Sequence, residues 1–168
     1  MSVDWNELYR STFRDLVRFI HRKVWDEERA MDLAQEVFVR ALREEPERPR
    51  AWLFTVASNL ATDEIRTVLR RKKHLALLKS EQETRSSSEA TPHTELAKQE
   101  RWERVRGALD TLAERDREIL LLWDAGMSYQ EIAEAMELSP GAVGTTLARA
   151  RKRLVTAHEE MERDHAAR

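Results

Sequence analysis

A helix-turn-helix pattern at residues 128–153 carries the side chains with the clearest chemical role. Ser128 and Glu131 have the spacing of a capping box and predict the start of a short helix. Ser139 and Pro140 then predict an N-cap followed by proline at the first position of a longer helix. The second helix of such a unit enters the major groove, with its N-terminal residues facing base edges. The pattern therefore predicts binding to duplex DNA.

The longer helix has two distinct faces. Val143 and Leu147 form its apolar stripe. At 100° per residue, four residues lie on the opposite face: Ala142, Thr145, Arg149 and Lys152. A methyl group and a hydroxyl can meet base edges, and cations can hold phosphates. The open alternative is a helical hairpin whose basic face is only solvated.

A second polar stripe follows the break at residues 44–50, which contains Pro46 and Pro49. Its members lie at helical spacing and lead into the basic stretch 70–73: Asn59, Thr62, Asp63, Arg66 and Arg70. Amide, hydroxyl and carboxylate groups can read bases, and arginines can hold phosphates. An ordinary solvated helix face is the open alternative.

A third polar face lies earlier in the chain, where Asp32, Gln35 and Glu36 share one side of an expected helix. Taken alone, this pattern equally fits a solvated acidic face.

Catalytic and metal-binding patterns are missing from the sequence. The five histidines are scattered, without metal-ligand spacing on one face: His21, His74, His93, His158 and His165. The chain has no cysteine and no glycine-rich phosphate loop. We expect no catalytic residue, no metal and no cofactor, and hence no enzyme.

Composition predicts an all-α fold that positions these faces. Of the 168 residues, 41% are hydrophobic and 36% are charged, which fits long, solvated helices, and four glycines and four prolines leave few turns. The net charge of −2 excludes a generally basic protein, so DNA binding would depend on local patches. The N-terminus lacks signal-peptide features, and no apolar run reaches about 18 residues, so we expect a cytoplasmic protein.

Hydrophobic periodicity predicts helices in both halves of the chain, with cores that include Met31, Leu42 and Trp123. Between the halves, residues 79–95 hold only one apolar side chain and are rich in Ser, Thr and Glu. Such a segment cannot bury enough surface to order itself. We therefore expect two small helical domains joined by a flexible linker, the second containing the helix-turn-helix.

Three motifs in this order resemble the extracytoplasmic-function (ECF) family of bacterial sigma factors. Residues 32–42, DLAQEVFVRAL, are similar to the family segment that docks on the clamp of the largest RNA polymerase subunit. Residues 52–66, WLFTVASNLATDEIR, resemble its −10 promoter helix. Residues 109–112, 115–118 and 129–133 resemble its −35 domain.

The resemblance implies a division of roles and a set of site residues. Residues 1–75 would bind the polymerase clamp and the −10 element, 76–97 would be the linker, and 98–162 would bind the −35 element. Polymerase contacts would come from Asp32, Gln35, Glu36 and Val39. Contacts to −10 DNA would come from Arg48, Arg50, Asn59, Thr62, Asp63, Arg66 and Arg70. Contacts to −35 DNA would come from Ser139, Gly141, Ala142, Thr145, Thr146, Arg149 and Lys152.

The family also implies partners and a mechanism. The partners are core RNA polymerase, through its largest and second-largest subunits, promoter DNA and an anti-sigma factor, without membrane insertion. The DNA strands open at −10, with one unstacked base held in the loop 44–50, which costs a few kcal/mol. The chain departs from the family pattern at Pro140, where an acidic residue is frequent, and at Gly144 and Thr146, where a basic one is. These departures leave the −35 sequence preference open.

Two other functions fit parts of the pattern. A sigma mimic would use the same fold to sequester an anti-sigma factor without touching DNA, but it would not need the basic stretch 66–73 or the basic recognition helix. A plain helix-turn-helix repressor would not need the clamp-like segment 32–42. A sigma factor accounts for all three motifs.

Overall fold

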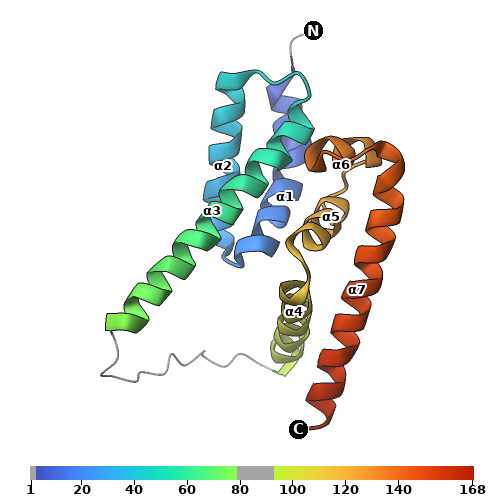
Figure 1. Ribbon diagram of the computed structural model, residues 1–168. Helices are drawn as coiled ribbons and strands as arrows, with labels where there is room; N and C mark the ends of the chain where they lie inside the picture. The colour runs from blue at the N-terminus through green and yellow to red at the C-terminus, as the bar shows by residue number, and fades with distance from the viewer. Residues whose placement is uncertain (1–2, 79–92) are drawn as a thin grey trace.

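The computed structural model describes residues 3–78 and 93–168 (Figure 1). Within these ranges the chain forms helices and no strand, so the expected all-α class is confirmed. The helices are α1 (Trp5–Val24), α2 (Glu27–Glu44), α3 (Pro49–Leu78), α4 (His93–Thr111), α5 (Glu114–Asp124), α6 (Tyr129–Met136) and α7 (Pro140–Ala166). Most of the expected linker, residues 79–92, lies outside the described residues.

Helices α1, α2 and α3 form the first half of the molecule. The Asp4 carboxylate accepts hydrogen bonds from two backbone N–H groups of the first turn of α1, and the Asp26 carboxylate accepts one, from the Arg29 N–H, at the start of α2. Each of these helices ends at a residue with left-handed backbone, Trp25 (φ 57°) and Glu45 (φ 43°). These sharp ends let the three helices turn back on a shared apolar core centred on the following buried side chains: Leu16, Phe19, Ile20, Val37, Leu53 and Phe54.

Helix α3 extends well beyond this core. Its last buried side chain is Ala61, and every residue from Val68 to Leu78 is exposed. At 1.5 Å per residue, the 11 exposed residues from Val68 to Leu78 span about 16 Å. The helix continues past residue 75, where the sequence had placed the end of the first domain.

The second half contains the expected helix-turn-helix, formed by α6 and α7. Ser128 Oγ accepts a hydrogen bond from the Glu131 N–H at 3.2 Å, and Glu131 Oε2 accepts one from the Ser128 N–H at 2.8 Å. The predicted capping box is thereby confirmed. Gly126 ends the preceding segment with a φ of 82°, which favours glycine. Ser139 stands at the N-cap of α7 before Pro140, as predicted, but its side chain makes no capping hydrogen bond.

Helices α4 and α7 run side by side in opposite directions (Figure 1). Arg104 of α4 pairs with Glu162 of α7 at 2.9 Å. Gly107 allows this close approach, because a Cβ at that position would lie 3.0 Å from the end of the Met161 side chain. Helix α4 begins at His93, inside the segment 76–97 that the sequence assigned to the linker.

The two halves pack directly against each other, with α3 against α6 and α1 against α5. Their buried side chains form one continuous cluster. Several side chains that periodicity placed in the core are instead exposed, among them Met31 (42%), Leu42 (55%) and Trp123 (41%). The prediction was wrong because helical spacing marks a broad apolar stripe, and only packing decides which edge of the stripe is covered. No helix in the described ranges is long and apolar enough to cross a bilayer.

Candidate nucleic-acid interface

The outward face of α7 presents the side chains expected at the −35 element. Thr145, Arg149 and Lys152 are exposed, and Ala142 is half-buried. On the opposite side, Val143, Leu147 and Ala150 are buried against the rest of the helix-turn-helix. Burial of that stripe holds the polar face outward, because rotating the helix would bring apolar groups into water.

The basic residues near Lys152 have different roles in the structure. The Arg151 guanidinium lies over the Trp123 ring at 5.0 Å, and Trp123 also contacts Tyr129, with ring centroids 5.6 Å apart. Arg153 Nη1 lies 2.6 Å from Asp116 Oδ2, a carboxylate in a residue only 6% exposed. These two arginines hold α7 against α5. In the described part of the chain, Arg149 and Lys152 have no recorded ion pair.

The first turn of α7 offers small polar groups. Ser139 and Gly141 are exposed, and the Ser139 hydroxyl makes no capping bond. The Thr146 hydroxyl is half-buried and donates to the Ala142 carbonyl oxygen at 2.8 Å. Thr146 can therefore accept a hydrogen bond from DNA more readily than it can donate one.

The polar stripe of α3 divides into two parts. Asp63, Arg66 and Arg70 are exposed on the part of the helix beyond the core, and Thr62 beside them is half-buried. The Arg66 guanidinium lies 3.9 Å from the Asp63 carboxylate, and Arg70 Nε donates to the Arg66 carbonyl at 3.3 Å. These local contacts leave the arginine heads facing solvent.

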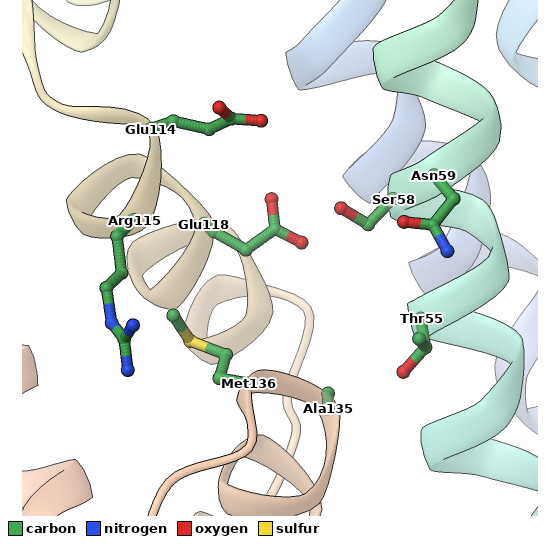
Figure 2. Close-up of a pocket in the computed structure, with 8 residues that line it drawn as sticks. All are labelled: Thr55, Ser58, Asn59, Glu114, Arg115, Glu118, Ala135 and Met136. Atoms are coloured by element: carbon green, nitrogen blue, oxygen red, sulfur yellow. The ribbon is translucent and has the colours of Figure 1, made fainter.

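Asn59, in contrast, faces the second half of the molecule. Together with Thr55 and Ser58 it lines an open cleft of about 350 Å³ between α3 and helices α5 and α6. Figure 2 shows Glu114 and Glu118 on the opposite wall, pointing toward the α3 side chains. The Asn59 amide expected to meet DNA therefore lines a cleft whose opposite wall carries two carboxylates.

The loop before α3 and the first turn of α3 also form ion pairs with the second half of the molecule. Arg48 pairs with Glu134, and Arg50 Nε lies 3.3 Å from Glu131 Oε1. Arg50 Nη2 additionally donates to the Gly126 carbonyl at 3.3 Å. Arg48 and Arg50, two of the four arginines assigned to −10 DNA from the sequence, thus contact α6 or the turn before it.

The expected polymerase-binding face lies along α2. Asp32, Gln35, Glu36 and Val39 are all exposed. Asp32 lies 3.9 Å from Arg29, and Glu36 pairs with Arg40 at 2.5 Å, so local cations partly balance both carboxylates.

Met31 and Leu42 belong to the same exposed side of α2. Met31, Gln35 and Val39 stand four residues apart, and Leu42 follows three residues later, so all four share one face. Helical periodicity alone predicts Met31 and Leu42 in the core. Their spacing from Gln35 and Val39 was the signal that could have placed them on the exposed face.

A bidentate ion pair between Arg29 and Glu64 joins α2 to α3 beside the exposed face of α2. Arg29 Nε and Nη2 donate to the two Glu64 carboxylate oxygens at 2.8 and 2.9 Å. The hydrogen bond from Arg29 lowers the pKa of Glu64 below its ordinary value, against a smaller opposing effect of burial. The same hydrogen bond raises the pKa of Arg29.

Comparison with known proteins places both halves in one family. Residues 8–71 match the family Sigma-70 region 2, and residues 102–154 match Sigma-70, region 4. The RNA polymerase sigma factor YlaC of Bacillus subtilis is 30% identical over 94% of this chain and 95% of its own. The ECF RNA polymerase sigma factor SigM of the same species is 29% identical over 92% and 93%.

Solved structures show the same fold. CnrH, in complex with the cytosolic domain of CnrY, has a TM-score of 0.64 at 24% identity, covering 93% of this chain and 88% of its own. RpoE of Bartonella quintana, in complex with the anti-sigma factor NepR, has a TM-score of 0.60 at 22% identity, covering 93% and 97%. With its two region matches and its full-length relatives, the chain belongs to the ECF family of RNA polymerase sigma factors.

Proposed function

We propose that the chain binds core RNA polymerase, brings it to promoters and opens the DNA at the −10 element. The observation that carries this proposal is the outward face of α7, where Thr145, Arg149 and Lys152 are exposed over a buried apolar stripe. This face lies within residues matched to Sigma-70, region 4. It has the composition and position of a recognition helix.

The −35 contacts follow from position along α7. Ser139, Gly141 and Ala142 are small and lie in the first turn, where the helix can go deepest into the groove. Thr145 and Thr146 follow in the next turn, where their side chains would still reach the edges of the bases. Arg149 and Lys152, a turn or more later, have the reach to hold flanking phosphates.

The −10 contacts would come from α3 and the loop before it. Asn59, Thr62 and Asp63 offer groups that read base edges, and Arg66 and Arg70 extend toward phosphates on the solvated part of the helix. Arg48 lies in the loop proposed to hold the unstacked base, and Arg50 lies in the first turn of α3. That loop begins at the end of α2 and leads directly into α3.

The exposed side of α2 would bind the polymerase clamp. Asp32 and Glu36 are carboxylates and would repel phosphates, whereas they suit a protein partner. Gln35 and Val39 stand beside the two carboxylates on the exposed side of α2, and we add Met31 and Leu42 to this surface because they are exposed on the same side as Gln35 and Val39. Exposed apolar side chains bordered by charged ones are typical of protein interfaces.

The proposed contacts divide the chain into two functional domains. We propose that residues 1–75 serve the clamp and the −10 element and 98–162 the −35 element, with 76–97 as a linker. Brief proteolysis of the full chain should then cut between residues 79 and 95 and leave two resistant fragments. Cleavage mainly within α1 or α2 would contradict the division.

A protein inhibitor is also proposed as a partner. The solved relative RpoE was crystallised with the anti-sigma factor NepR. An anti-sigma factor acting on this chain would compete with polymerase or promoter DNA for the same faces, in the cytoplasm.

Run-off transcription with core polymerase on a genomic promoter library tests the function. The full chain should yield transcripts from a subset of promoters that share −10 and −35 sequences. Gln35→Ala with Glu36→Ala should weaken core binding, and Glu159→Gln with Glu160→Gln, both exposed on α7, should not. Binding to an anti-sigma factor without any transcripts would indicate a sigma mimic instead.

A further inference from the structure

Two arginines hold the recognition helix α7 against the two ends of α5, which packs beside it (Figure 1). Arg153 Nη1 lies 2.6 Å from Asp116 Oδ2, in the first turn of α5. The Arg151 guanidinium lies 5.0 Å from the centre of the Trp123 ring, in the last turn of α5. These two α5 residues are about 10 Å apart along the helix axis. Helix α7 is therefore attached to α5 at two separate points.

The directions of the two arginines around α7 make this attachment restrictive. At 100° per residue, side chains two positions apart point about 200° apart, so Arg151 and Arg153 lie on nearly opposite sides of the helix. Lys152 points between them, about 100° from each, and is exposed. Turning α7 about its axis would draw at least one arginine away from its partner on α5.

Both arginine contacts depend on direction, unlike the apolar contacts beneath them. The Asp116 carboxylate belongs to a residue only 6% exposed and would be left as an unpaired buried charge if its cation moved away. A guanidinium is attracted to the face of an indole ring, so the Trp123 contact also needs a defined geometry. Ala150, the last fully buried residue of α7, contributes a methyl group whose burial has no preferred direction. The arginine contacts therefore restrict the rotation of α7 more narrowly than apolar burial does.

Tyr129 of α6 extends the contact on the Arg151 side of α7. Its ring lies beside Trp123, with ring centroids 5.6 Å apart. A Cβ at Gly144 of α7 would lie 3.5 Å from Tyr129 Cε2. Gly144 and Arg151 are seven residues apart and so share one side of α7. Both helices of the helix-turn-helix thus meet the end of α5 on this side.

We propose that the two ends of α5 set the rotation of α7 and thereby the −35 sequence preference, with Asp116 and Trp123 as positioning residues that act through the two arginines. This inference rests on the proposed function, which places Thr145 against base edges. The positioning residues themselves make no contact with DNA.

The size of a helix makes small rotations matter for base contacts. A rotation of about 20° would move the outer side-chain atoms of α7, about 5–6 Å from its axis, by about 2 Å. A hydrogen bond forms over a range of only about 0.5 Å in donor–acceptor distance. The short Thr145 side chain cannot follow such a shift, whereas the long Lys152 side chain can still reach a phosphate. Loss of the α5 contacts should therefore reduce sequence preference more than phosphate binding.

The experiment changes α5 and leaves every side chain of α7 in place. The test variant is Asp116→Asn with Trp123→Leu, which removes the carboxylate and the aromatic ring that hold the two arginines. The control, Asp164→Asn, changes the net charge equally at an exposed position near the end of α7. Trp123→Phe is the conservative variant, because it keeps an aromatic face for Arg151. Each full chain is assembled with core polymerase and tested on fluorescent duplexes that carry a promoter found by run-off transcription, or single-base changes in its −35 element.

A single mismatched −35 base pair should weaken wild-type binding by about 5- to 150-fold. In the test variant most of this discrimination should be lost at the position that Thr145 reads. The slope of affinity against salt should stay unchanged, because Arg149 and Lys152 are retained. The control and Trp123→Phe should keep the wild-type discrimination.

Two results would overturn the inference. One is full discrimination in a test variant that has the wild-type circular dichroism spectrum. If the double variant does not fold, Trp123→Leu alone, on an exposed side chain, must lose discrimination. The other is a salt slope about one unit lower in Arg151→Met or Arg153→Met with the sequence preference kept, because that arginine would then contact a phosphate directly. Failure of the proposed function is seen separately, because the wild-type chain would then give no sequence-dependent binding and no transcripts with core polymerase.

Discussion

Lys23 and Glu118 form an ion pair that joins the two halves of the chain across 95 residues of sequence. The Lys23 Nζ and Glu118 Oε2 atoms lie 2.5 Å apart, and the side chains are 5% and 16% exposed. Ser58 supplies the ammonium with a second acceptor at 2.8 Å. Three helices, α1, α3 and α5, therefore meet at one buried positive charge.

Removing one partner of this pair should destabilise the fold more than the loss of both partners would suggest. In Glu118→Leu the Lys23 ammonium keeps only the Ser58 hydroxyl, and in Lys23→Met the Glu118 carboxylate loses its partner, so each should destabilise by about 1–3 kcal/mol. The double variant leaves no buried charge and should lose less than the sum. Urea unfolding followed by circular dichroism measures the three free energies. Strictly additive losses would show that the two groups do not interact in solution.

Arg153 and Asp116 should show an asymmetric effect. The Asp116 residue is 6% exposed, whereas 60% of the Arg153 side chain is exposed. Arg153→Met leaves a buried carboxylate unpaired and should cost about 1–3 kcal/mol, while Asp116→Asn frees only a solvated guanidinium and should cost less. Lys152→Met, on the exposed neighbour, should stay within about 0.5 kcal/mol of the wild type. Equal losses in the two partners would argue against the pairing.

The Arg29–Glu64 pair should stabilise the fold in a pH-dependent way. Because its pKa is lowered in the folded chain, Glu64 contributes stability above its unfolded pKa, about 4.3, and that contribution is lost as the pH falls through the folded pKa. Glu64→Gln should cost up to about 1 kcal/mol at pH 7, since Arg29 is partly solvated. The deficit should shrink below about pH 4.3.

Urea titrations at several pH values measure this difference in the free energy of unfolding. Glu103→Gln, an exposed carboxylate of α4, is the control and should give a difference that hardly changes with pH. A Glu64→Gln deficit that grows as the pH falls would have the wrong sign for a lowered pKa.

Lys152 and Thr145 should separate phosphate contacts from base contacts. Losing a phosphate contact with Lys152→Ala should weaken binding evenly across sequences and reduce the salt slope by about one unit. Losing a base contact with Thr145→Ala should cost about 1–3 kcal/mol on the preferred site and relax choice at one position. Binding of −35 duplexes at several salt concentrations distinguishes them. If the two signatures were exchanged, α7 would lie in the groove in another orientation.

Much of this protein can be predicted from its sequence, because the signals are local. The capping box at Ser128 and Glu131, and Pro140 at the start of α7, depend on residues within one helical turn. The helix wheel also separated Arg149 and Lys152 from the buried stripe, since backbone geometry fixes which side chains share a face. The three ordered motifs led to the family that comparison then confirmed.

Only the tertiary structure decided which basic residues of a sequence pattern stay free to contact a partner. The sequence shows four cations from Arg149 to Arg153, but Arg151 lies against Trp123 and Arg153 against Asp116. No local pattern indicates that Arg48 and Arg50 would meet the carboxylates of Glu134 and Glu131, more than 80 residues away. Pairing between distant residues depends on how whole helices pack, which local periodicity does not encode. The sequence thus determined the helices and their faces, and packing determined which faces are covered.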